Sequence, residues 1–185
     1  MVTGRRAIVK GAVGLGLGLA IGSPTRAQSD SGAARPKAGD LLVRDGDASA
    51  TPLTADDVAA GAPPIQAWPM DPAGNTVRSA SRLNRVLLVR LDIDALGPET
   101  KPLAAGGIVG YTAICTHAGC EVDDWLANER LLYCSCHSSQ FDPRNGARVV
   151  DGPAPRSLPA LPLQVVDGRL VVAGSFTTPV GFESA

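Results

Sequence analysis

Six residues that can bind a metal or form disulfides lie in one short part of this 185-residue chain. The four cysteines and both histidines all fall between Cys115 and His137, in two stretches that read CTHAGC (residues 115–120) and CSCHSS (residues 134–139). Thiolate and imidazole are the side chains that bind zinc, copper and iron–sulfur clusters. Because none of the six lies elsewhere in the chain, the sequence indicates one shared site.

A closed zinc site and a pair of structural disulfides are the two simpler explanations of the same six residues. Zinc loops usually have C-x₂₋₄-C or H-x₃₋₅-H spacing, and C-x-H followed by C-x-C-H matches neither pattern. Two disulfides would leave both histidines without a role. The spacing argues against zinc and the unused histidines argue against two disulfides, but the residues alone exclude neither explanation.

The two stretches resemble the Rieske family, in which C-x-H-x-G-C is paired with C-x-C-H-x-S. The sequence from Gly152 through Pro153 and Ala154 to Pro155 is similar to the proline loop that shields the cluster in that family. The resemblance extends from about Tyr111 to Leu163, which is under a third of the chain.

The resemblance implies one [2Fe–2S] cluster with two protein ligands on each iron. Cys115 and Cys134 would hold the inner iron, and His117 and His137 the outer iron. In Rieske centres two histidines take the place of two cysteines on one iron. The family also implies a disulfide between Cys120 and Cys136, as in its high-potential branch. An exported protein would keep free thiols reduced only with difficulty, which agrees with that pairing.

Two further residues are implied to tune the cluster. Ser139 stands where the family's serine donates a hydrogen bond to a bridging sulfide, and Phe141 stands where quinol-oxidising members have a tyrosine. Rieske potentials lie at roughly −150 to +300 mV, against about −400 mV for plant-type ferredoxins. We expect a potential above that of ferredoxins but below that of members with both hydroxyl donors.

The implied function is that of a one-electron carrier subunit of a periplasmic or membrane-associated oxidoreductase, rather than a catalyst on its own. The partner would be a cytochrome, a quinol-oxidising subunit or a molybdenum subunit. The chain is similar to the Rieske subunits of quinol–cytochrome complexes, except that Ala118 stands where leucine is usual. Phe141 and the Trp68-Pro69 region are more similar to the small subunit of arsenite oxidase.

Two other classes of function compete with electron transfer. A Rieske oxygenase component needs a further iron bound by two histidines and a carboxylate, and no histidine is left for it. A zinc-stapled binding module is the remote alternative. The net charge is −1 with acidic and basic residues mixed, so no nucleic-acid partner is indicated.

The N-terminus is typical of an export signal. Arg5-Arg6 precede an apolar, glycine-rich run that ends before Ser23, and residues 1–27 are expected to be a twin-arginine signal or a short anchor. The run is shorter than the roughly 20 residues that span a bilayer. Cleavage after Ala27 and membrane attachment through residues 5–22 are therefore the two alternatives, and both place the protein in the periplasm.

The elements that must position the loops indicate an all-β fold. Gly and Pro number 21 and 15, and short Val- and Leu-rich runs alternate with turns. We expect a Rieske-like sandwich of antiparallel sheets over residues 40–185, with a cluster-binding subdomain inserted at about 111–156. A flexible linker is expected at residues 28–39.

Individual elements follow from local patterns. Thr54 is expected to begin a helical turn, and turn signals cluster at residues 69–82. Asp167-Gly168 predicts a type I′ turn. The expected strands are 40–44, 86–93, 107–114, 131–133, 163–166 and 169–172.

Overall fold

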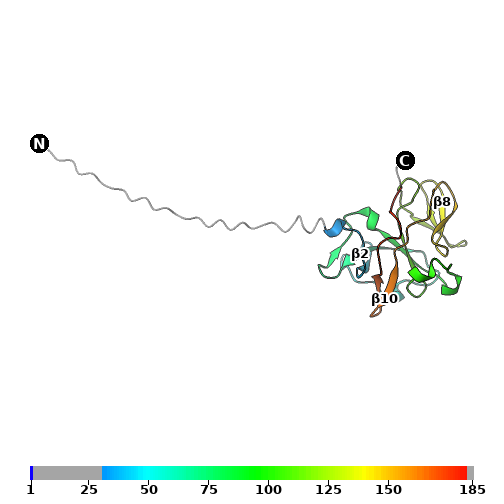
Figure 1. The fold of residues 1–185 in the computed structure, drawn as a ribbon, viewed down its shortest axis with the longest axis horizontal. Coiled ribbons are helices and arrows are strands. Elements are labelled where there is room, and N and C mark those ends of the chain that lie inside the picture. The colour runs from blue at the N-terminus through cyan, green and yellow to red at the C-terminus, as the bar shows by residue number, and fades with distance from the viewer. Residues whose placement is uncertain (2–30, 183–185) are drawn as a thin grey trace.

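The computed structural model describes residue 1 and residues 31–182, and within them the fold is built from β-strands. Eleven short strands form two antiparallel sheets, and the other regular elements are single helical turns (Figure 1). The predicted all-β class is therefore confirmed. The predicted signal, residues 1–27, lies almost entirely outside the described residues. In the described part of the chain, no helix combines the length and the apolar character needed to cross a bilayer.

The larger sheet has seven strands in the order β10-β11-β1-β2-β4-β5, with β3 paired to β2. It brings the two ends of the described chain together, because β1 pairs with both β2 and β11. Its strands are β1 (Leu41–Arg44), β2 (Ile65–Asp71), β3 (Thr76–Val77), β4 (Val86–Arg90), β5 (Ile108–Thr112), β10 (Leu163–Val166) and β11 (Arg169–Val172).

The smaller sheet has four strands in the order β6-β7-β8-β9. Its strands are β6 (Asp124–Leu126), β7 (Leu131–Cys134), β8 (Ser139–Asp142) and β9 (Arg148–Asp151). All four lie inside the range 111–156, where the cluster-binding subdomain was expected. The first cysteine–histidine stretch follows β5, and the second joins β7 to β8.

Strand β4 contributes to two hydrophobic cores because side chains alternate between the faces of a strand. Leu87 and Val89 pack with residues of the small sheet, among them Leu132. Val86 and Leu88 face the other way, into the core of the large sheet. The small sheet is thus joined to the large one through side chains of β4 and β5.

Several local predictions are confirmed. The hairpin of β10 and β11 turns at Asp167 and Gly168, whose φ angles of 50° and 77° are those a type I′ turn requires. Thr54 caps a 3₁₀ turn, Ala55–Asp57, through reciprocal hydrogen bonds with Asp57. The strand predicted at 86–93 ends earlier, at Arg90, because Ile93–Ala95 forms another 3₁₀ turn.

Proline 69 was predicted to lie in a turn region, but it lies inside strand β2. Its carbonyl accepts a hydrogen bond from the backbone N–H of Arg78 at 2.8 Å, on the side away from β1. The nitrogen of Pro69 faces that same side, so β1 loses no hydrogen bond to it. The turn itself lies further on, at residues 72–75.

The segment before β1 is held against the domain where the structure describes it. Arg78 donates to the carbonyl of Ser31 at 3.1 Å and forms a buried ion pair with Asp40 at 2.7 Å. Asn84 donates to the carbonyl of Ala34 at 2.9 Å. Residues 31–39 of the expected linker are therefore docked, since these buried partners lie far away in the sequence.

Candidate metal centre

The first loop, residues 115–120, is a tight turn that begins shortly after β5, which ends at the buried Thr112. The N–H of Cys115 donates to the carbonyl of Cys120 at 2.7 Å, and the N–H of Gly119 donates to the carbonyl of Cys115 at 3.1 Å. Gly119 has a φ of +73°, a conformation that glycine adopts without strain. These bonds fix the direction in which the side chains of Cys115 and His117 leave the loop.

The second loop, residues 134–139, is the connection of a β-hairpin. Cys134 pairs with Ser139 at the ends of β7 and β8, so the residues between them turn outward. The carboxylate of Asp123 accepts hydrogen bonds from the N–H of Ser135 at 3.0 Å and from its hydroxyl at 2.6 Å. These bonds lower the pKa of Asp123. The loop is therefore braced from the segment that precedes β6.

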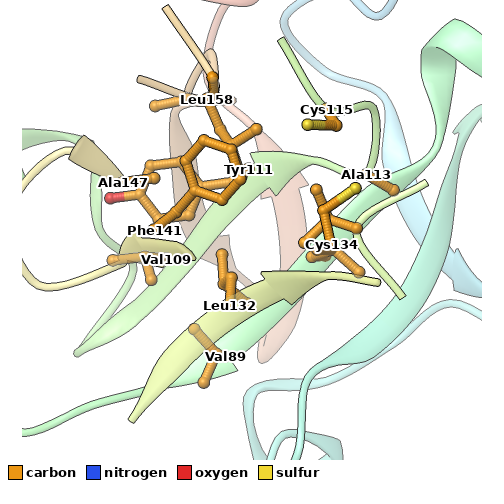
Figure 2. Close-up of a cluster of buried hydrophobic side chains, with 14 of the residues drawn as sticks. Val89, Val109, Tyr111, Ala113, Cys115, Leu132, Cys134, Phe141, Ala147 and Leu158 are labelled. Carbon is orange, nitrogen blue, oxygen red and sulfur yellow. The ribbon is translucent and has the colours of Figure 1, made fainter. Parts of the chain in front are cut away.

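Two free thiols lie at the base of the site. Cys115 and Cys134 are each 1% exposed and belong to the core shared by the two sheets (Figure 2). Burial, and then the neighbouring Cys115, raise the pKa of the Cys134 thiol to about 11. Two thiolates side by side in this core would need a cation between them, which is what an iron site supplies.

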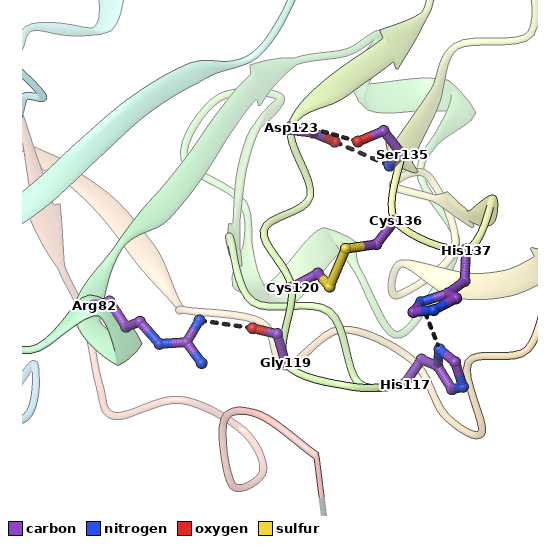
Figure 3. Close-up of a disulfide and its surroundings, with 8 residues drawn as sticks. All are labelled: Arg82, His117, Gly119, Cys120, Asp123, Ser135, Cys136 and His137. Carbon is purple, nitrogen blue, oxygen red and sulfur yellow. Dashed lines mark hydrogen bonds between the residues drawn. A yellow bond between two sulfur atoms is a disulfide. The ribbon is translucent and has the colours of Figure 1, made fainter.

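Two imidazole rings, one from each loop, lie together near the surface. His117 and His137 have ring centroids 4.7 Å apart and planes at 89°, and their Nδ1 atoms are 3.3 Å apart (Figure 3). His117 is partly buried and His137 is exposed. The structure thus pairs the two thiols in the core and the two rings at the surface, with one thiol and one ring from each loop.

The other two cysteines form the disulfide Cys120–Cys136, which joins the two loops (Figure 3). Their sulfurs lie within 4.8 Å of a ring nitrogen of His137. Because the sulfurs are bonded to each other, they are not thiolate ligands. The donor set that is left, two thiols and two imidazoles divided equally between the loops, fits a [2Fe–2S] unit.

Ser139 is fully buried, and its hydroxyl accepts a hydrogen bond from the N–H of Ala154 at 3.2 Å. The predicted proline loop is therefore in direct contact with the second loop. Gly152 makes the contact close, since a Cβ there would lie 2.5 Å from the Cα of Ser139. Pro153 and Pro155 on either side of Ala154 are exposed.

Phe141 is 0% exposed in the same core, near Tyr111 and Leu158 (Figure 2). The hydroxyl of Tyr111 donates to the carbonyl of Pro143 at 2.9 Å, and burial raises the pKa of that phenol. Phe141 itself brings no polar group to the site.

Sequence reasoning missed the residues that brace the loops from outside. Asp123 holds the second loop, and Arg82 donates to the carbonyl of Gly119 at 2.6 Å. The hydroxyl of Thr116 donates to the carbonyl of Arg156 at 2.6 Å. Arg82 is 37 residues from Gly119, and Arg156 is 40 residues from Thr116. No local sequence pattern therefore links either pair.

Comparison with known proteins shows what this site is similar to. A family model described as the Rieske [2Fe-2S] domain matches residues 77–162. The chain is 43% identical over 97 residues to a Haloferax mediterranei protein named "Putative respiratory nitrate reductase subunit Rieske", covering 51% of this chain and 43% of that protein. It is 41% identical over 106 residues to the cytochrome bc1 complex Rieske iron-sulfur subunit of Corynebacterium diphtheriae, covering 53% of this chain and 26% of the relative.

The chain thus spans less than half the length of either relative. Among solved structures, it resembles the soluble domain of Rieske protein II from Sulfolobus acidocaldarius. That match has a TM-score of 0.42 at 25% identity and covers 54% of this chain and 65% of the other.

Proposed function

We propose that this chain, whose residues 77–162 match the Rieske [2Fe-2S] domain model, serves as the one-electron carrier subunit of a periplasmic or membrane-associated oxidoreductase. One observation carries the proposal: two loops that a disulfide joins each carry one buried free thiol and one imidazole, and the two imidazoles face each other. Cys115 and Cys134 would hold one iron, and His117 and His137 the other. The cluster, when bound, supplies one-electron redox chemistry.

The protein's own residues set the conditions of that chemistry. Imidazole is neutral where thiolate is negative, so two histidine ligands make reduction less costly than four cysteines would. The core around Cys115 and Cys134 keeps water from the sulfur side. The exposed ring of His137 would bring the outer iron within short range of a partner surface. The proposed route for electrons is therefore through the histidine face.

The partner is proposed as a redox subunit that docks on this face. The relatives named as cytochrome bc1 subunits support a quinol-oxidising or cytochrome partner, and the relative named for nitrate reductase supports a respiratory reductase. A molybdenum subunit of the arsenite-oxidase kind is the further candidate, supported by Phe141 and by Trp68-Pro69. A pull-down of native protein, scored for haem, molybdenum and quinol oxidation, would distinguish these partners.

The organisation of the chain completes the proposal. Residues 1–27 would direct export by the twin-arginine route or anchor the chain, residues 28–30 would continue into the docked segment, and residues 40–185 would form the domain. Twin-arginine export carries folded proteins, so the cluster would be inserted before the disulfide forms in an oxidising compartment. N-terminal sequencing of the native protein would decide between cleavage after Ala27 and retention.

Iron and spectroscopy test the central claim. Purified protein should contain two irons per chain, absorb visible light and, after dithionite reduction, show the rhombic low-g resonance of a Rieske centre. Cys115→Ser should abolish that signal, while Ser157→Ala, a change of similar size on an exposed residue, should leave it unchanged. Protein that binds only zinc, or that binds iron without this resonance, would refute the proposal.

A further inference from the structure

Arg82 contacts the first loop from outside it. It belongs to a 3₁₀ turn, Arg82–Asn84, that directly precedes β4. Its Nη1 atom donates to the carbonyl oxygen of Gly119 at 2.6 Å (Figure 3). Gly119 lies two residues after His117 and one before Cys120. The guanidinium therefore contacts the backbone of the loop that carries one ligand of each kind.

Within residues 31–182, Arg82 forms no ion pair with a carboxylate. Other arginines of the domain form ion pairs: Arg85 with Glu121 at 2.9 Å, and Arg78 with Asp40 at 2.7 Å. Among the described residues, no carboxylate lies within ion-pair distance of Arg82. Within this part of the chain, its positive charge therefore acts on the loop without a carboxylate partner.

The C-terminal segment holds the same point of the loop from a second direction. A Cβ on Gly119 would lie 2.9 Å from the ring of Phe182, so this ring packs directly on the glycine. Arg156 fixes the segment by donating to the carbonyls of Pro179 at 2.9 Å and Gly181 at 2.7 Å. Gly119 is thus enclosed by Phe182 and Arg82, which leaves the loop little freedom to shift.

We propose that Arg82 is a positioning and tuning residue that raises the reduction potential of the cluster. This inference rests on the proposed function. Reduction adds a negative charge to the cluster, and a nearby uncompensated cation stabilises the reduced form more than the oxidised form. The hydrogen bond also offsets the negative end of the Gly119 carbonyl dipole. Because Arg82 is exposed, its effect should weaken as salt screens it.

A charge series on the full-length holoprotein tests this role. Arg82→Lys, Arg82→Gln and Arg82→Glu are compared by redox titration at low and at high ionic strength. The potential should fall in the order wild type, Lys, Gln, Glu, and the spread should narrow at high salt. Arg169→Gln and Arg169→Glu are the matched controls, since Arg169 is exposed on β11 and forms no ion pair among the described residues.

The outcomes separate this inference from the proposed function. Wild-type protein without a Rieske signal would refute the function itself. A wild-type signal, with Arg82 variants that shift the potential no more than the Arg169 variants, would refute only the role of Arg82. Loss of the cluster in every Arg82 variant, including lysine, would also refute tuning, because the residue would then be needed for assembly. Protease cleavage of the apoproteins at the loop reports the positioning role separately.

Discussion

The hydroxyl of Ser139 accepts a hydrogen bond from the backbone N–H of Ala154, and this bond joins the hairpin that carries two cysteines and a histidine to the proline loop. As an acceptor, the hydroxyl keeps its own proton free to donate. Ser139 is fully buried, so this proton would be directed within the site rather than to solvent.

Ser139→Ala should lower the reduction potential. Hydrogen bonds to cluster sulfur stabilise the more negative reduced form, and this variant removes one donor. The measurement is a redox titration followed by visible circular dichroism. Ser138→Ala is the control, since Ser138 directly precedes Ser139 in the chain but has an exposed side chain. An equal shift in both variants would contradict the role given to Ser139.

Phe141→Tyr should raise the reduction potential, because it restores the hydroxyl that quinol-oxidising members of the family have at this place. The ring is 0% exposed in a core that also holds both free cysteines, so the new donor would be kept from water. The same titration checks the result. A fall, or no change, would argue against the hydrogen-bond explanation of the potential.

Gly152→Ala should destabilise the fold by about 2 kcal/mol or more, from a strained φ and from overpacking. The φ of Gly152 is +86°, and an added Cβ would lie 2.5 Å from Ser139. Chemical denaturation measures the loss. Gly168→Ala is the control, because Gly168 has a φ of +77° with open space around it and so carries the backbone strain alone. Equal losses would mean that the contact with Ser139 contributes nothing.

The apoprotein should lose stability as the pH rises from about 9 to about 11. Burial and the neighbouring Cys115 raise the pKa of the Cys134 thiol from 9.0 to about 11. In that window the folded state holds a proton that the unfolded chain has released, so the free energy of unfolding falls with rising pH. Urea denaturation of iron-free protein at several pH values measures the slope. Cys134→Ser should flatten it, and an unchanged slope would assign the effect to another group.

The sequence allowed the cluster loops and several strands to be predicted because their signals are local. The two loops have fixed spacing, and Asp167-Gly168 suits a single turn type. Strand β2 was missed because proline usually interrupts a strand. Only the hydrogen bonds to the neighbouring segments show that the nitrogen of Pro69 faces away from β1, where no donor is needed. The contact of Arg82 with Gly119 depends on tertiary packing, so no spacing could have revealed it.

Strand β4, with one face in each hydrophobic core, has a consequence for how the molecule opens. Leu87 and Val89 support the small sheet, while Val86 and Leu88 support the large one. Loss of this strand would remove side chains from both cores together, so we expect the cluster-bearing part to unfold with the large sheet. Backbone amides on both sides of β4 should therefore exchange with deuterium at one common rate, as a single cooperative unit.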